Sequence, residues 1–141
     1  MARTMHTREV GNLVISRQTR ETPTDWEWRE FLDVVARNRA KATKTRILVV
    51  TDGGGPNPEQ RKQLQKALSG HTFRVAVVTD SIKVRFIVSS VALLNSEIQT
   101  FAIADMDRAC EYLGLSRLEV EVALKVAEEL GRELTADATR K

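Results

Sequence analysis

Short apolar runs and amphipathic segments alternate along most of the chain. Four runs rich in β-branched residues predict strands at Val10–Thr19, Ile47–Val50, Phe73–Thr79 and Ile98–Ile103. The second and third runs show no alternation of apolar and polar residues, which is typical of strands covered on both faces. The pattern therefore predicts a sheet with at least two central strands.

The segments between these runs carry the signals that begin and end helices. Thr24 and Glu27 form a capping box before the first helix. Asn57 as N-cap and Pro58 at the first helical position begin the second helix, and Gly70 ends it. The apolar faces of these two helices are Trp28, Phe31, Leu32 and Val35, and Leu64, Ala67 and Leu68. Each helix can therefore pack one face on a sheet.

Three further helices are predicted. Either Asp80 or Ser81 caps the third helix, whose apolar positions are Val84, Ile87, Val88 and Val91. Asp105 caps a short helix that ends at Gly114, and a capping box that begins at Ser116 opens the closing helix. The predicted apolar stripe of the closing helix is Leu118, Val122, Val126 and Leu130. That helix either caps the sheet or mediates self-association.

The resulting order is β-α-β-α-β-α-β-α followed by one extra helix. Such alternation places parallel strands side by side with helices packed on the sheet, and four strands are too few for a closed barrel. At 141 residues the chain is long enough for one domain with its own core. The fold class is therefore α/β.

Composition excludes several classes of protein. Hydrophobic residues make up 42% and charged residues 29%, which fits a globular chain and not a disordered one. No apolar run reaches the roughly 18 residues of a membrane span, and the basic N-terminus lacks the apolar region of a secretory signal. Cys110 is the single cysteine, and His6 and His71 lie far apart in the chain. We therefore expect no disulfide framework, no metal site and no cofactor, and a cytoplasmic location.

The net charge is +3, and one basic stretch is especially dense. It consists of Arg37, Arg39, Lys41, Lys44 and Arg46, with no acid between them. A nucleic-acid or anionic-membrane surface is one interpretation. The other is a helix end, where cations favour the negative end of the helix dipole. Because no aromatic residue is interleaved to stack on bases, we favour the helix end and expect no nucleic-acid partner.

The turn Asp-Gly-Gly-Gly-Pro-Asn at residues 52–57, called the Gly-rich loop below, is the most unusual local feature. It follows a buried strand and opens a helix, where open α/β sheets bind ligands and free N–H groups attract anions. It lacks the lysine and hydroxyl of a P-loop and the spacing of a dinucleotide fingerprint, and its prolines remove N–H donors. It is either a tight turn that requires positive φ angles or a loop that binds a partner or an anion.

A second candidate is the Thr79-Asp80-Ser81 turn, with Lys83 and Arg85 one turn into the next helix. It follows the neighbouring strand, so it should lie at the same edge of the sheet as the Gly-rich loop. Hydroxyls and cations suit a phosphate or an acidic loop of a partner, although helix capping and solvated surface charge also explain them. The candidate partner- or ligand-binding residues are Asp52, Gly53, Gly54, Gly55, Asn57, Arg61, Ser81, Lys83 and Arg85.

No catalytic constellation is visible. No serine, cysteine or threonine has a recognisable histidine and orienting acid. Asp105 and Asp107 are explained by a helix N-terminus. Cys110 lies on the same helix face as Leu113, which favours a buried inert thiol over a nucleophile. We therefore expect that the protein is not an enzyme.

Several blocks resemble SpoIIAA-like proteins of the STAS group, whose best-known members are anti-anti-sigma factors. In the C-terminal half the blocks are the strand at 75–78, the capped helix with Lys83 and Arg85, the strand at 98–101 and the helix that ends at Tyr112-Leu113. In the N-terminal half they are the first predicted strand, the helix after it and the strand Ile47–Val50. The resemblance covers residues 10–114 and implies a four-stranded mixed sheet, with its first strand at an edge and helices mainly on one face. It leaves 1–9 as an N-terminal extension, 115–134 as an additional helix and 135–141 as a polar tail.

One position departs from this family. Anti-anti-sigma factors carry a phosphorylatable serine in the turn after the strand equivalent to Ile47–Val50. The Gly-rich loop has no serine, Thr51 belongs to the end of the strand, and Ser81 lies in a different loop. We therefore do not expect the usual kinase switch at this turn.

Three hypotheses follow. The first is a non-enzymatic regulatory domain that docks a protein partner at the rim formed by the Gly-rich loop and the third helix, with Lys83 and Arg85 against an acidic surface. The alternative is a module that binds a nucleotide or a lipid, because some STAS-like and SEC14-like domains are associated with small molecules or lipids. The third is self-association through the closing helix, whose acidic surface is complementary to the basic stretch at 37–46.

Overall fold

The computed structural model describes residues 2–93, 95 and 97–139. Five strands form one mixed sheet in the order β1-β2-β3-β4-β5. They are β1 (Met5–Val10), β2 (Leu13–Gln18), β3 (Arg46–Thr51), β4 (Arg74–Val78) and β5 (Ile98–Phe101). β1 runs antiparallel to β2, and β2 to β5 are parallel to one another. The prediction of an α/β fold with a mixed sheet is confirmed, but the sheet has five strands and not four.

The fifth strand comes from the N-terminal segment that sequence analysis left as an extension. β1 and β2 form a hairpin in which Val10 is paired with Leu13, so that Gly11 and Asn12 alone make the turn. Gly11 has φ +60°, a conformation that glycine adopts without strain. β1 lies at the edge of the sheet, where Met5 is buried but the other end of the strand is exposed. Its sequence therefore mixes apolar and polar residues and gives only a weak strand signal. The predicted strand Val10–Thr19 is therefore only the second arm of a hairpin.

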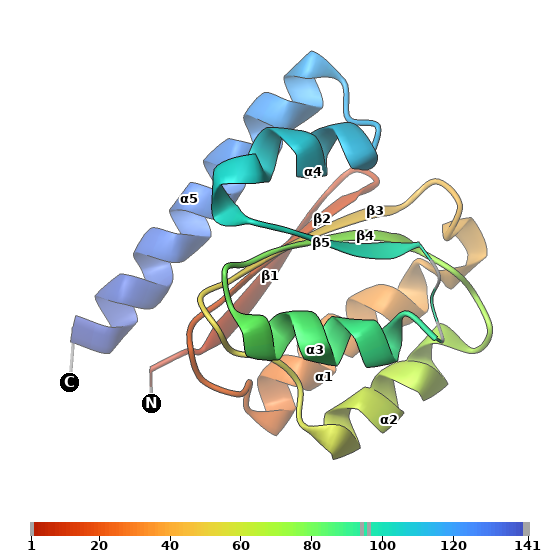
Figure 1. Ribbon diagram of the computed structural model, residues 1–141, viewed down its shortest axis with the longest axis horizontal. Coiled ribbons are helices and arrows are strands. Elements are labelled where there is room, and N and C mark those ends of the chain that lie inside the picture. The colour runs from red at the N-terminus through yellow and green to blue at the C-terminus, as the bar shows by residue number, and fades with distance from the viewer. Residues whose placement is uncertain (1, 94, 96, 140–141) are drawn as a thin grey trace.

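Helices cover both faces of the sheet (Figure 1). α1 (Asp25–Arg37), α2 (Pro58–Leu68) and α3 (Ile82–Val91) lie on one face, and α4 (Met106–Tyr112) and α5 (Arg117–Thr139) on the other. Short 3-10 turns follow α1 at Arg39–Lys41 and precede α4 at Ile103–Asp105. Three of the four helices within residues 10–114 thus lie on one face, as expected, but α4 joins α5 on the other, because the central strands are apolar on both sides and each side needs a cover.

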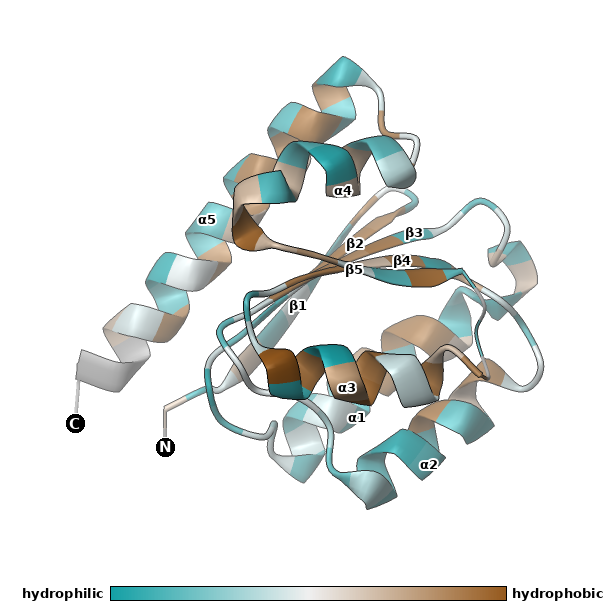
Figure 2. Cartoon of the chain, viewed as in Figure 1, coloured by the Kyte–Doolittle hydropathy of each residue, from teal (hydrophilic) through white to brown (hydrophobic). Residues whose placement is uncertain are grey.

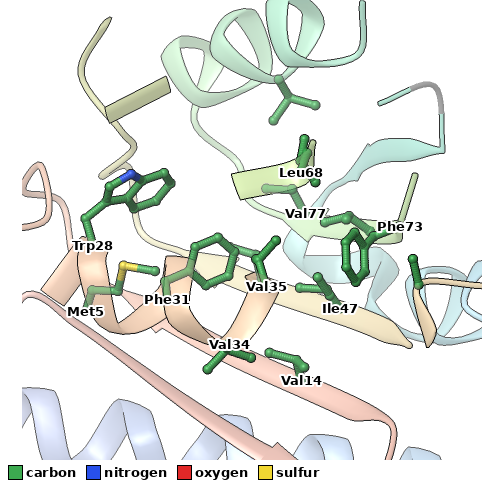
Figure 3. Packing of buried hydrophobic residues seen from close by; sticks show 14 of the residues in the cluster. Met5, Val14, Trp28, Phe31, Val34, Val35, Ile47, Leu68, Phe73 and Val77 are labelled. Atoms are coloured by element: carbon green, nitrogen blue, oxygen red, sulfur yellow. The ribbon is translucent and has the colours of Figure 1, made fainter. Parts of the chain in front are cut away.

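Two apolar cores result from this arrangement. The first lies under α1, α2 and α3 and contains Trp28, Phe31, Ile47, Phe73 and Val77, as Figure 3 shows. The second lies under α4 and α5 and is built from alternate strand residues such as Leu48 and Val78, together with Leu130. Strand side chains alternate between the two cores, as the period of two along a strand requires.

Most of the predicted helix caps are present, but Asp105, expected to cap α4, makes no capping hydrogen bond with its side chain. Thr24 with Glu27 and Asn57 with Gln60 form reciprocal capping boxes at the starts of α1 and α2. Ser81 caps α3, whereas the carboxylate of its neighbour Asp80 accepts a hydrogen bond from the N–H of Ile103.

α5 differs from its prediction at both ends. The capping box at Ser116 and Glu119 is present, but Leu118, expected on the buried stripe, is 70% exposed. The helix continues beyond residue 134 to Thr139, so most of the expected polar tail is helical. Ala123, Val126 and Leu130 pack on the sheet, which confirms that α5 caps it.

Candidate functional site

The carboxyl ends of β3 and β4 bring the two candidate turns together. A Cβ placed on Gly53 would lie 3.9 Å from the Ser81 hydroxyl, and one on Gly55 would lie 3.2 Å from the Ile87 side chain. The Gly-rich loop therefore lies against the first turns of α3. This confirms that both turns share one edge of the sheet, since parallel strands end at the same edge.

The glycines of the loop have a structural cause. A Cβ on Gly54 would lie 2.1 Å from the carbonyl oxygen of Glu21, so only glycine fits beside this backbone. Gly54 N donates to Thr19 O at 2.8 Å, and Gly53 N donates to the Thr51 hydroxyl at 3.2 Å. Asp52 N donates to Gln18 O at 3.1 Å. Three N–H groups of the loop are thus already used within the chain, which leaves little of a phosphate-binding nest.

Four of the predicted polar site residues have partners that explain them. Asp52 forms an ion pair with Arg17 at 3.1 Å. Asn57 and Ser81 cap α2 and α3, and Arg61 donates to the Pro56 carbonyl at 3.1 Å. These side chains therefore hold the loop and the helix starts in place.

Lys83 and Arg85 are different, because both are exposed and neither forms an ion pair with a residue that the structure describes. Arg85 only reaches the Thr79 carbonyl, at 3.5 Å. The neighbouring α2 adds further basic side chains, so the two helices together carry Arg61, Lys62, Lys66, Lys83 and Arg85 but a single acid, Glu59. Some cations elsewhere in the fold, such as Arg8 and Arg74, are paired with glutamates.

An exposed apolar stripe runs along α3 and was missed by sequence analysis. Ile82 is 83% exposed, Phe86 81% and Leu93, just beyond the helix, 87%. Spacings of four and seven residues place them on one side of the helix axis, opposite the buried Val84, Val88 and Val91. In Figure 2, strongly hydrophobic segments of α3 alternate with hydrophilic ones. The available signal was the presence of Ile82 and Phe86 on the side of the helix opposite its predicted apolar face, which indicates a second contact surface.

The basic stretch at residues 37–46 is occupied by structural contacts. Arg37 pairs with Glu9, Arg46 pairs with Glu119, and Arg39 donates to the Ala67 carbonyl at 3.0 Å. α1 ends at Arg37, so the interpretation as a helix end is supported.

Cys110 lies in the second core at 2% exposure, as predicted. Burial, with a smaller contribution from the charge of Asp107, raises the pKa of its thiol above the ordinary value. Such a thiol is a poor nucleophile at neutral pH.

Within the described ranges, no cluster of three or more histidine, cysteine or acidic side chains could hold a metal ion. None of the helices in that part of the chain combines the length and the apolar character of a membrane span.

The candidate site is therefore the exposed face of α3, with Ile82, Lys83, Arg85 and Phe86, next to a Gly-rich loop whose conformation is set by its own backbone contacts. Comparison of the chain with protein-family models, curated proteins and solved structures finds no match. The similarity to STAS proteins therefore rests on the sequence blocks alone.

Proposed function

We propose that the chain is a non-enzymatic, STAS-like regulatory domain that docks a protein partner through the exposed face of α3, beside the Gly-rich loop. The observation that carries this proposal is the pair Ile82 and Phe86, more than four-fifths exposed and flanked by Lys83 and Arg85, which have no acidic partner among the residues that the structure describes. We place such a domain in the cytoplasm.

The surface defines the chemistry of its partner. Burial of a side chain such as isoleucine or phenylalanine contributes about 1.5–3 kcal/mol, so two such anchors can form the centre of an interface. Cations at the rim select a partner with acidic residues around an apolar pocket and accelerate the encounter. The matching partner is therefore a protein with an apolar groove bordered by aspartate or glutamate.

A kinase switch in the loop is not part of the proposal. Thr51, the hydroxyl closest to the family's phosphoacceptor position, is buried and donates to the Gly54 carbonyl at 2.7 Å. A kinase would have to open the loop to reach it. Regulation through this domain would then depend on occupancy of the α3 face.

Two other hypotheses lose support. Nucleotide binding at the Gly-rich loop would need N–H donors that already bond within the chain. Self-association through charge complementarity between α5 and the basic stretch is weakened because Glu119 pairs with Arg46 of the same chain. Val126 and Leu130 of the α5 stripe are likewise covered by the protein's own sheet.

The test uses two variants of the α3 face and one matched control. Phe86→Asp removes the apolar anchor, Arg85→Glu reverses the charge, and Leu118→Asp makes the same apolar-to-acidic change at an exposed site on the other helix layer. All three substitutions lie at exposed positions, so each melting temperature should stay within a few degrees of wild type.

We expect a protein captured by the wild-type chain to bind Leu118→Asp equally and to lose at least tenfold in affinity for Phe86→Asp. The affinity should be measured by calorimetry with both proteins purified. Equal affinity for wild type and Phe86→Asp would refute docking through α3. Failure of the wild-type chain to retain any protein above a bead control would count against an interaction domain altogether.

A further inference from the structure

The two edges of the sheet differ in how they are protected. At the β1 edge, the Glu27 carboxylate accepts a hydrogen bond from Met5 N at 3.0 Å, and Arg3 donates to the Met5 carbonyl at 3.1 Å. Arg8 and Glu9 add charge to the same strand. Charged side chains and occupied backbone groups hinder the pairing of an edge strand with another chain. The β1 edge is therefore guarded.

The β5 edge has no such protection among the described residues. β5 consists of isoleucine, glutamine, threonine and phenylalanine, with no charge and no proline. It is the last strand of the sheet, and in Figure 1 it lies nearest the viewer, with no described segment in front of it. A groove of about 310 Å³ lies beside it, between β5 and the side of α3 that carries Arg85, Ser89 and Ala92. This edge is therefore open to a second strand.

The pairing with β4 determines which backbone groups of β5 point outward. The carbonyls of Glu97 and Phe101 accept hydrogen bonds from the β4 side, at 3.1 and 2.8 Å. Successive residues of a strand turn their backbone groups to opposite sides, so Ile98, Thr100 and Ala102 direct theirs away from β4.

Four of these outward groups have no partner among the described residues. Ile98 N donates to the Asn95 carbonyl, and the Ala102 carbonyl accepts from Asp105 N, so both are already used. The N–H groups of Thr100 and Ala102 and the carbonyls of Ile98 and Thr100 remain. Thr100 is thus the centre of the free set, with an acceptor on one side and a donor on the other.

We propose that β5 pairs with β5 of a second copy of the chain, antiparallel and about a two-fold axis at Thr100. The two Thr100 residues then exchange both of their backbone hydrogen bonds, and each Ala102 N donates to the Ile98 carbonyl of the other copy. A register shifted by two residues would instead require the Ile98 N–H or the Ala102 carbonyl, which are already bonded. Because the free set is its own complement, it fits a second copy with two-fold symmetry.

The charges near the edge favour the same arrangement. The two-fold axis is perpendicular to the sheet, so the two α3 helices lie side by side on one face and run in opposite directions. Each Arg85, near the start of α3, then lies beside the C-terminal half of the other α3, whose last turn has no basic residue of its own. Among the described residues, Ile82 and Phe86 do not line the groove, so this pairing uses a different surface from the proposed docking face.

The test measures the mass of the chain by sedimentation equilibrium, at about 10 μM to 1 mM because a small interface of this kind is weak. The wild-type chain should form a dimer. Thr100→Lys and Thr100→Glu each place like charges opposite one another, so each alone should associate at least tenfold more weakly. An equimolar mixture of the two variants should restore the dimer, because lysine then faces glutamate. Phe86→Asp is the control and should dimerise as the wild type does.

A second variant covers the case in which a charge at this half-buried position unfolds the chain, as circular dichroism would show. Thr100→Pro removes only an outward N–H, which an edge strand tolerates, and should also abolish the dimer. Thr100→Ala keeps that N–H and should retain it.

Amide hydrogen exchange gives an independent readout. In the dimer, exchange should slow several-fold at Thr100 and Ala102 and change less at Gln99 and Phe101, whose N–H groups face β4. A wild-type chain that stays monomeric up to about 1 mM would overturn the proposal. A dimer that persists in the single charge variants, or a mixture that does not associate, would overturn the pairing about Thr100. Loss of the dimer in Phe86→Asp would place the contact on the docking face instead.

Discussion

Replacement of Glu27 tests how the first helix is attached to the sheet. This carboxylate is 1% exposed and belongs to the capping box of α1. One oxygen accepts from Thr4 N at 2.8 Å and Met5 N at 3.0 Å, which ties α1 to β1. The other accepts from Thr24 N at 3.1 Å and from the hydroxyls of Thr4 and Thr24. Burial by itself favours the neutral form, but these hydrogen bonds outweigh it and hold the pKa of Glu27 below its ordinary value.

Two substitutions should differ in a predictable way. Glu27→Ala leaves three backbone N–H groups without their acceptor, two of them on the buried residues Thr4 and Met5. At about 1–3 kcal/mol for each buried group, we expect a loss of about 3–5 kcal/mol. Glu27→Gln retains one acceptor oxygen but turns an NH₂ group toward one set of donors, so its loss should be about 1–2 kcal/mol.

The assay is urea unfolding at constant temperature, in which a change of midpoint at constant slope reports stability. Glu30→Ala is the matched control on the same helix, since the Glu30–Arg3 ion pair at 2.6 Å is partly exposed and should contribute less than about 1 kcal/mol. A loss for Glu27→Ala no larger than that of the control would refute the reasoning.

The pH dependence has a defined sign. Because the pKa of Glu27 is lower in the folded state, its contribution is complete above the unfolded value of roughly 4.3 and is lost as the pH falls through the folded value. The stability difference between wild type and Glu27→Gln should therefore shrink on acidification from neutral pH. A difference that stays constant down to pH 3 would contradict a stabilising carboxylate.

Three further predictions concern the loop, the thiol and the tyrosine. Gly54→Ala places a methyl group 2.1 Å from the Glu21 carbonyl, so the urea midpoint should report a loss of at least about 2 kcal/mol, and an unchanged midpoint would be inconsistent with this contact. Cys110, the single cysteine, should react with an aromatic disulfide reagent only when the protein unfolds, because burial shields the thiol and raises its pKa. Rapid reaction of the native protein would disprove this. The Tyr112 hydroxyl donates to the Glu97 carbonyl at 2.5 Å, and burial is the main cause that raises the pKa of this tyrosine above 10. Its ultraviolet titration should therefore occur at a higher pH than that of free tyrosine. The stability of the protein should fall as the pH rises past 10. Tyr112→Phe should cost about 1 kcal/mol in the same urea assay, and no change would mean that this hydrogen bond is not formed in solution.

Local signals in the sequence predicted much of the fold. Capping boxes, the proline at the first position of α2 and the glycine after it act within a few residues, so they are readable without tertiary contacts. Runs without polar alternation identified β3 and β4 as strands covered on both faces. β1 was missed because its residues are mixed in polarity and its pairing depends on β2, although the Gly11-Asn12 turn signals a hairpin.

The candidate site, like the fold, was only partly predictable from the sequence. The sequence by itself showed that residues 52–57 are an unusual turn at the end of a buried strand, and that Lys83 and Arg85 lie near it. Only the tertiary structure showed that Gly54 faces the backbone of Glu21, that Asp52 is paired with Arg17, and that the outer side of α3 has no cover. The physical reason is that glycine, aspartate or phenylalanine has the same local preferences whether its neighbour is backbone, a cation or solvent. Which neighbour it has depends on segments distant in the chain, and that decides whether a residue supports the fold or is available to a partner.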